Sequence, residues 1–112
     1  MASAPRDPTY AIAWRDGDGP TQVGKLELRD DGIHLEGGSV GGRLFATTLR
    51  YRDISGLRMA RTGRAERLNG RPTLLLQRAG RSSLRIASVE GLGSTTEIFA
   101  RVARLVPACA AA

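Results

Sequence analysis

The residues most able to do chemistry lie in the stretch TTLRYRDISGLRMAR, residues 47 to 61, where Asp53 and Ser55 stand between arginines. A carboxylate and a hydroxyl among guanidinium groups could grip a phosphate-bearing ligand. The same Asp-Ile-Ser-Gly is also typical of a polar corner between two strands, because Asp and Ser hydrogen-bond backbone amides that a bend leaves free. Apolar residues alternate on both sides of it, and this period of two favours the corner.

Catalysis has few candidate residues in this sequence. The chain has one histidine, His34, and one cysteine, Cys109, so no His/Cys cluster can hold zinc. The alternation around His34 predicts that it lies on the solvent-facing side of a strand. The glycine-rich segment 37 to 42 has neither the Walker ending nor the dinucleotide-binding spacing, and no helix pattern follows it. We therefore expect no enzyme activity, no cofactor and no metal.

Positive charge is concentrated in the middle of the chain. Residues 43 to 85 hold eleven arginines against Asp53 and Glu66, whereas residues 1 to 42 hold four basic and seven acidic side chains. Such a field attracts phosphates, anionic lipids or acidic proteins without choosing among them. The candidate basic interaction surface consists of Arg50, Arg52, Arg58, Arg61, Arg64, Arg67 and Arg71.

Length and composition favour one folded domain. The chain has 112 residues, of which 41% are hydrophobic and 25% charged, as is ordinary for a globular protein with one core. No apolar run approaches the roughly 18 residues of a membrane span, and the first residues do not resemble a secretory signal, so a cytoplasmic location is expected. We predict a disordered lead-in over residues 1–8, a single domain over 9–107 and a flexible tail over 108–112.

An alternation with a period of two predicts short strands over most of the domain. Asp-Gly within residues 30–32 predicts a hairpin turn, and three consecutive leucines, residues 74–76, indicate a strand covered on both faces. The expected strands lie at residues 9–14, within the hairpins 23–37 and 72–89, at 43–52, and directly after the Asp-Ile-Ser corner.

The period changes near the end, where residues 94–106 predict an amphipathic helix. Ser94 and Glu97 have the spacing of a capping box, and Pro107 predicts the stop. The helix must bury its apolar face against the strands that precede it. That apolar stripe consists of Ile98, Val102, Leu105 and Val106.

With seven short strands followed by one helix, the chain resembles pleckstrin-homology-like (PH-like) domains, in particular the bacterial and GRAM-type members. The resemblance rests on the stretches GKLELRDDGIHLEG, LRYRDISGLRMAR, RPTLLLQRAGRSSLRIAS and TTEIFARVARLV. It implies a mainly β fold in which two antiparallel sheets form a partly open barrel, capped by one C-terminal amphipathic α-helix. In this family a Tyr-x-Asp-Ile pattern, resembling Tyr51, Asp53 and Ile54 here, falls where the chain crosses between the sheets.

These features favour a non-catalytic binding or scaffold module that acts through protein-protein interaction, with an acidic partner or by self-association. Binding to an anionic membrane through the arginine-rich loop, residues 61 to 71, is a second hypothesis. In the lipid-binding members of the PH-like family the first hairpin loop grips phosphates, but here that loop carries Asp16 and Asp18, which would repel them. Nucleic acid is expected to make only nonspecific contacts, because aromatic residues are not interleaved with the arginines. No small-molecule substrate is expected.

A third hypothesis comes from a resemblance to the PilZ domain, a small β-barrel that binds cyclic di-GMP through Arg-x-x-x-Arg followed by Asp/Asn-x-Ser-x-x-Gly. Asp53 and Ser55 have the required spacing, but Arg58 stands where that motif has its glycine. Two arginine pairs with the required spacing come after the aspartate instead of before it: Arg67 with Arg71, and Arg81 with Arg85.

Overall fold

The computed structural model describes residues 9–38, 44–60, 68 and 71–107. The predicted lead-in and tail lie outside these residues. The elements are β1 (Thr9–Asp16), β2 (Gln22–Leu28), β3 (Gly32–Gly38), β4 (Leu44–Arg50), the 3₁₀ helix η1 (Tyr51–Asp53), β5 (Ile54–Ala60), β6 (Thr73–Arg78), β7 (Leu84–Ser88) and α1 (Leu92–Leu105). The prediction of a mainly β chain with seven strands and one C-terminal helix is confirmed.

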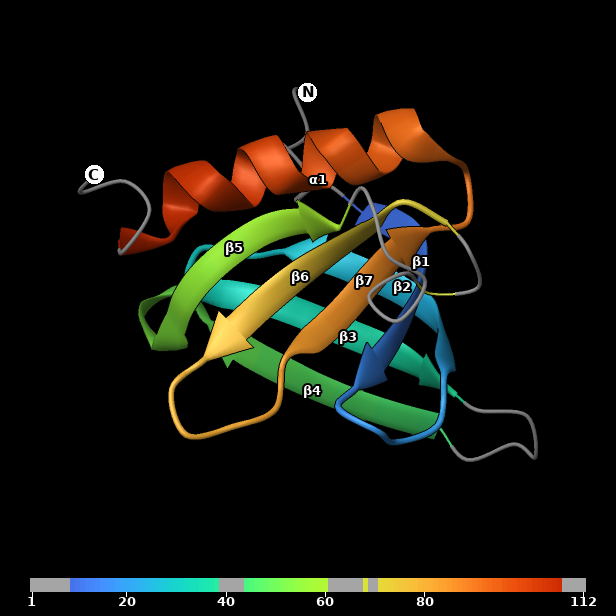
Figure 1. The fold of residues 1–112 in the computed structure, drawn as a ribbon, viewed down its shortest axis with the longest axis horizontal. Coiled ribbons are helices and arrows are strands. Elements are labelled where there is room, and N and C mark those ends of the chain that lie inside the picture. Colours follow the sequence, from blue (N-terminus) through green and yellow to red (C-terminus); the bar gives the residue numbers. More distant parts are fainter. Residues whose placement is uncertain (1–8, 39–43, 61–67, 69–70, 108–112) are drawn as a thin grey trace, which may run out of the picture.

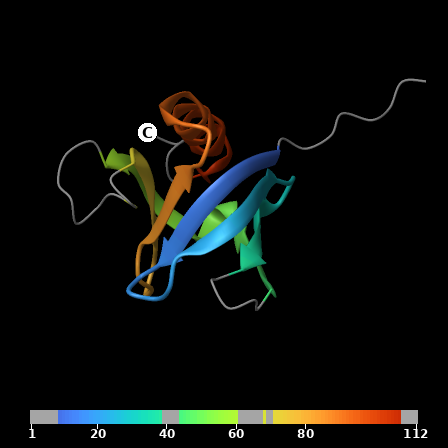
Figure 2. The same cartoon turned by 90° about the vertical axis from the view of Figure 1, so that its right-hand side faces the viewer.

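All seven strands belong to one antiparallel sheet with the order β4-β3-β2-β1-β7-β6-β5. Strand β1 pairs with β2 over Thr9–Trp14 and with β7 over Ile12–Asp16, so it joins the early strands to the late ones. The predicted division into two sheets is therefore not confirmed. The sheet is strongly bent, so that β2–β4 and β5–β7 lie on different sides of a common interior (Figures 1 and 2).

The interior holds the residues that the alternation predicts to point inward. On β1, Tyr10, Ile12 and Trp14 are buried, while Ala11 between them is exposed. Burying one large aliphatic side chain, such as that of Ile12, stabilises the fold by about 1.5 to 3 kcal/mol. Every strand contributes to this core, which consists of Tyr10, Ile12, Trp14, Leu26, Leu28, Ile33, Leu35, Leu49, Tyr51, Ile54, Leu74, Leu76, Leu84, Ile86, Ile98, Val102 and Val106.

Part of the opposite face of the sheet is also covered, as the described residues show. The three leucines of β6, residues 74–76, are all buried, which confirms the prediction of a strand covered on both faces. Leu75 lies on the face away from the main core. On that same outer face, Leu68 packs with Ala13 and Ala87, which pair with each other across β1 and β7. The two small side chains leave room for a leucine to lie over the strands.

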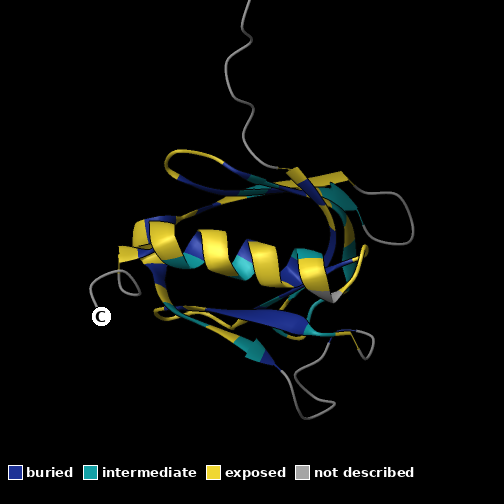
Figure 3. Cartoon of the chain, turned by 90° about the horizontal axis from the view of Figure 1, so that it is seen from above, coloured by how far each residue is buried: buried dark blue, intermediate teal, exposed yellow. Residues whose placement is uncertain are grey.

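Helix α1 lies across one end of the bent sheet and contacts β5, β6 and β7 (Figure 1). Ile98, Val102 and Val106 are fully buried, and the face turned away from the sheet is exposed (Figure 3). The placement of Leu105 on the apolar stripe is wrong, because 43% of its surface is exposed. It lies about 60° around the helix from Val102, on the side away from Val106. None of the helices in the described part of the chain has the length and apolarity to cross a membrane.

The helix begins before the predicted position and without the predicted capping box. Gly91 is the N-cap and Leu92 the first helical residue, so Ser94 falls inside the first turn, and no side chain caps this end. Thr95 fixes the start of the helix instead. Its buried hydroxyl accepts the N–H of Ser88 at 3.0 Å and donates to the carbonyl of Gly91 at 3.3 Å. A contact with the end of β7 has therefore replaced the local cap.

One polar contact fastens the first strand to the helix. The phenol of Tyr10 donates a hydrogen bond to Oε2 of Glu97 at 2.6 Å, and Nε of Arg101 lies 3.8 Å from the same oxygen. Burial, reinforced by the hydrogen bond to Glu97, raises the pKa of Tyr10 to about 12. The contact joins residues 87 positions apart, and it depends on the phenol keeping its proton.

We predict that Tyr10→Phe lowers the free energy of unfolding by about 1 kcal/mol at neutral pH, because one hydrogen bond is lost. The pKa of Tyr10 in the folded state exceeds its ordinary value of 10.0, so this residue's contribution is complete below pH 10 and disappears as the pH rises through about 12. Urea unfolding at a series of pH values measures both effects. If the free energy of unfolding fell equally in wild type and variant above pH 10, the stabilising role assigned to the Tyr10 phenol would be contradicted.

Candidate functional site

The Asp-Ile-Ser stretch forms a corner that joins β4 and β5, the two edge strands of the sheet. Tyr51 anchors this corner. Its buried phenol donates to the carbonyl of Arg29 at 2.7 Å, and its N–H donates to the carbonyl of Asp31 at 3.3 Å. The turn between β2 and β3 therefore fixes the backbone that carries Arg50 and Arg52.

Asp53 and Ser55 do not cap the corner in the predicted way. Both side chains are exposed, and within the described residues neither hydrogen-bonds the backbone amides of the bend. The register of β5 shifts between Ile54 and Gly56, so Ser55 is the extra residue of a β-bulge. A bulge changes the direction in which a side chain points, and here Ser55 lines a hollow beside the corner.

The turn between β6 and β7 lies next to the corner because Arg78, at the end of β6, pairs with Ile54, at the start of β5. Gly80 in this turn has a φ of +71°, a conformation that favours glycine. The N–H of Gly17 donates to the carbonyl of Ser83 at 3.1 Å, which attaches the turn to the loop between β1 and β2. Three connecting segments therefore meet at this end of the sheet.

Arg78 is a buried cation at this meeting point, with 7% of its side chain exposed. Its Nη2 donates to Oδ1 of Asp16 at 2.7 Å and to the carbonyl of Ser82 at 2.8 Å. Its Nε is buried and has no hydrogen-bond partner in the described part of the chain. Only the guanidinium is buried, because 59% of the Asp16 side chain is exposed. Loss of the carboxylate would leave a buried cation with one acceptor fewer, which is destabilising.

Between the corner and the turn lies a hollow of about 640 Å³, called the arginine hollow here. Among the described residues its lining holds four arginines and a single carboxylate, that of Asp53. A second hollow, of about 490 Å³, has Arg78 and Arg81 in common with the arginine hollow and is also lined by Asp16. A third, of about 420 Å³, has Arg50 and Arg52 in common with it and is also lined by Asp30 and Asp31. The polar lining of the arginine hollow is Thr48, Arg50, Arg52, Asp53, Ser55, Arg78 and Arg81.

The seven arginines predicted as a basic interaction surface have different surroundings. Arg50 and Arg52 are exposed and line the arginine hollow, whereas Arg58 is exposed on β5 outside that lining. The guanidinium of Arg71 donates to the carbonyl of Ser88, at the end of β7, at 3.5 Å and to that of Val89, just after it, at 3.2 Å. These contacts attach Arg71 to the end of β7. The others lie outside the described residues: Arg61, Arg64 and Arg67.

The candidate surface predicted from the sequence did not include Arg78 and Arg81, which lie within the predicted hairpin 72–89. A signal for Arg78 was present, because it follows Leu74 and Leu76 at a spacing of two and therefore lies on the inward face of its strand. Antiparallel pairing of β5 with β6 also brings the end of one strand beside the start of the other. The partner of Arg78 could not be foreseen, because Asp16 lies 62 positions earlier.

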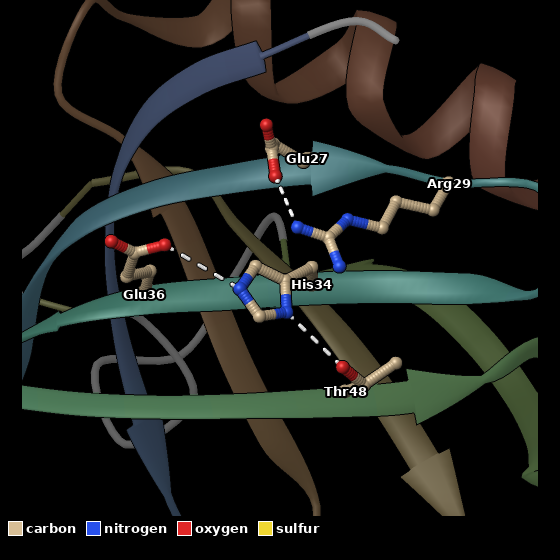
Figure 4. Close-up of polar contacts among 5 residues, drawn as sticks. All are labelled: Glu27, Arg29, His34, Glu36 and Thr48. Atoms are coloured by element: carbon tan, nitrogen blue, oxygen red, sulfur yellow. Dashed lines mark hydrogen bonds and ion pairs between the residues drawn. The ribbon is translucent and has the colours of Figure 1, made fainter.

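A second polar group lies on the outer face of β2, β3 and β4 (Figure 4). Nδ1 of His34 is 3.1 Å from the hydroxyl of Thr48, and its Nε2 is 3.5 Å from a carboxylate oxygen of Glu36. The histidine is on the predicted face, but only 14% of its side chain is exposed, so it is less open to solvent than expected. Beside it, Arg29 donates to Glu27 at 2.9 Å, and this hydrogen bond lowers the pKa of that carboxyl.

The order of hydroxyl, imidazole and carboxylate in this group resembles a hydrolase triad. However, the side chain of Glu36 is half exposed, and 3.5 Å is too long for a strong orienting hydrogen bond. Residues 37 to 41, Gly-Gly-Ser-Val-Gly, also match the sequence pattern of a nucleophile elbow. The described elements on either side are the strands β3 and β4, whereas an elbow stands between a strand and a helix. We interpret the group around His34 as a cross-strand tie.

Within the described ranges, no three His, Cys, Asp or Glu side chains are grouped so that they could hold a metal ion. Comparisons with protein-family models, curated proteins and solved structures give no match. The function must therefore be inferred from the geometry of the arginine hollow itself.

We predict that Asp16→Asn lowers the free energy of unfolding by about 1 to 3 kcal/mol, because the buried guanidinium of Arg78 loses its charged acceptor. The matched control is Asp18→Asn, an exposed aspartate two residues later whose carboxylate makes no ion pair within the described residues, and for which we expect a change within about 0.5 kcal/mol. Urea unfolding at neutral pH gives both values. Equal effects of the two substitutions would show that the pair with Arg78 contributes nothing.

Proposed function

We propose that this chain is a non-catalytic binding module that acts through protein-protein interaction and receives an acidic segment of its partner in the arginine hollow. The observation that carries the proposal is the position of Arg50, Arg52 and Arg81 around one concave surface. No hydrogen bond or ion pair occupies these three guanidinium groups within the described part of the chain. They remain free to bind carboxylates or other anions.

A PH-like architecture is part of this proposal. It is supported by the order of elements, seven antiparallel strands followed by a helix that packs across one end of the sheet. It is also supported by the joining of edge strands β4 and β5 through a corner instead of a ladder, as in a partly open barrel. In such a barrel the helix is structural, and the corners and turns are left for binding. A cytoplasmic location belongs to the same proposal.

The other hypotheses have less support from geometry. The loop expected to meet an anionic membrane lies mostly outside the described residues, and its last arginine, Arg71, is engaged with backbone carbonyls. Asp53 and Ser55 line the hollow, as a cyclic di-GMP site would require, but no Arg-x-x-x-Arg precedes them. Calorimetric titration with cyclic di-GMP tests that hypothesis, and gel filtration tests self-association through the free edges of the sheet.

We predict that a fluorescein-labelled, glutamate-rich peptide binds the chain and that Arg52→Glu weakens this binding at least about tenfold, because an attractive charge in the hollow becomes repulsive. The matched control is Arg104→Glu, an exposed position on α1 that changes the net charge equally. Fluorescence anisotropy at near-physiological salt measures both affinities.

Two results would contradict the proposal. Equal weakening by the two charge reversals would mean that the peptide responds only to net charge. Absence of measurable binding by the wild-type chain at millimolar peptide would remove the acidic-partner function. Circular dichroism of each variant checks that the fold is retained.

A further inference from the structure

We infer that the group bound in the arginine hollow is a phosphomonoester, carried by a phosphorylated side chain of the partner protein. This inference rests on the proposed function and names the chemistry of the ligand. It is drawn from the charge of the hollow, the origin of its donors and the state of one buried arginine.

The charge of the hollow matches a dianion. Its cations are Arg50, Arg52, Arg78 and Arg81. Asp53 in the lining balances one of these four charges, and Asp16 balances that of Arg78, so two remain. A phosphomonoester carries about −1.5 to −2 at pH 7, whereas a single carboxylate carries only one charge. Asp30 and Asp31 are left out of this count because they line the hollow of about 420 Å³ and not the arginine hollow.

The exposed cations come from two parts of the chain, the corner between β4 and β5 and the turn between β6 and β7. Arg50 ends β4, Arg52 lies in η1, and Arg81 lies in the turn between β6 and β7. A group held from several sides needs several acceptor oxygens, and a phosphomonoester offers three where a carboxylate offers two. The hydroxyl of Ser55, turned out of the ladder by its bulge, adds a neutral donor to the lining. The arrangement is therefore richer in donors than a carboxylate can use.

Arg78 supplies an independent observation. More than nine-tenths of its side chain is buried in the wall of the hollow, and its Nε has no partner in the described part of the chain. Buried donors without partners are uncommon and mark places where a bound water or anion completes the hydrogen bonding. A cation in a dry wall also interacts more strongly with an anion than a solvated one does. Arg78 thus adds a fixed, poorly solvated positive charge to the wall of the hollow, which favours a strongly charged anion there.

The shape and surroundings of the hollow favour a protein-borne phosphate over a membrane. A concavity of about 640 Å³ accommodates one side chain with its phosphoryl group, whereas a bilayer surface is flat. The adjoining loop carries Asp16 and Asp18, and a sheet of anionic lipids lying over this end would press against both carboxylates. Neither of these two carboxylates is in the lining of the arginine hollow, where a single phosphate would meet only that of Asp53 among the described residues.

The test uses the full chain and three fluorescein-labelled heptapeptide pools with the same random flanking residues. The central position is a mixture of phosphoserine, phosphothreonine and phosphotyrosine in the first pool, glutamate in the second and serine in the third. We expect the phosphorylated pool to bind at least about tenfold more tightly than the glutamate pool near pH 7.5, because it offers more charge and more acceptors. Arg52→Glu and Arg81→Glu should each remove this preference, while Arg104→Glu should retain it.

The pH supplies a second readout. The second ionisation of a phosphomonoester has a pKa of about 6, so the preference should shrink severalfold between about pH 7.5 and 5.5, a range in which a glutamate side chain stays ionised. A preference that does not change over this range would overturn the assignment of a dianion.

Equal binding of the phosphorylated and glutamate pools would overturn the inference and leave the acidic-partner function standing. Failure of both pools to bind would overturn both. Vesicles that contain phosphatidylinositol phosphates form a further arm. If they bind in a manner that depends on Arg52 while the phosphorylated pool does not, the hollow serves a lipid head group and the inference is wrong. The comparison of pools on the wild-type chain decides the matter even if a variant fails to fold.

Discussion

Strand β1 is hydrogen-bonded along both of its edges, to β2 on one side and to β7 on the other, and the rest of the structure depends on this double pairing. It makes one sheet out of strands that come early and late in the chain. A twisted sheet of seven strands with an apolar inner face bends until that face encloses a core, and α1 covers one open end. The chain must then pass from edge strand β4 to edge strand β5 through a corner. The arginine hollow lies where this corner meets the turn between β6 and β7.

Features set by near neighbours in the sequence were predictable. Alternation placed Tyr10, Ile12 and Trp14 in the core, because strand parity is a property of a few consecutive residues. Features set by distant partners were not. Alternation cannot say which strands pair, so one sheet could not be told from two. The helix start also escaped prediction, because the hydroxyl of Thr95 bonds the backbone at Ser88 and so competes with the local cap.

The residues of the candidate site also fall into those placed by their near neighbours in the sequence and those placed by distant partners. Parity placed Arg50 and Arg52 outside the core, although Arg52 lies in η1 and not in the strand predicted for residues 43–52. The cation that gives the hollow its buried charge, Arg78, needed two long-range facts, its pairing with Ile54 and its ion pair with Asp16. An arginine at the end of an apolar strand would ordinarily extend into solvent. Here Asp16, at the end of β1, supplies a carboxylate at that point, which allows the guanidinium to stay inside in the wall of the hollow.

The double pairing of β1 also sets an order of events when the chain folds. During synthesis β1 can pair with β2 at once, but its other edge has no partner until β7, more than sixty residues later, has been made. Until then β1 is an exposed edge, open to wrong partners. The closing of a loop of this length slows folding more than it affects stability. Helix α1, whose start is bonded to the end of β7, can dock only after that closure. The ion pair between Arg78 and Asp16 also waits for that closure, because it joins β6 to the end of β1. The hollow can therefore take shape early, but its buried cation gains its charged acceptor only when the sheet is complete.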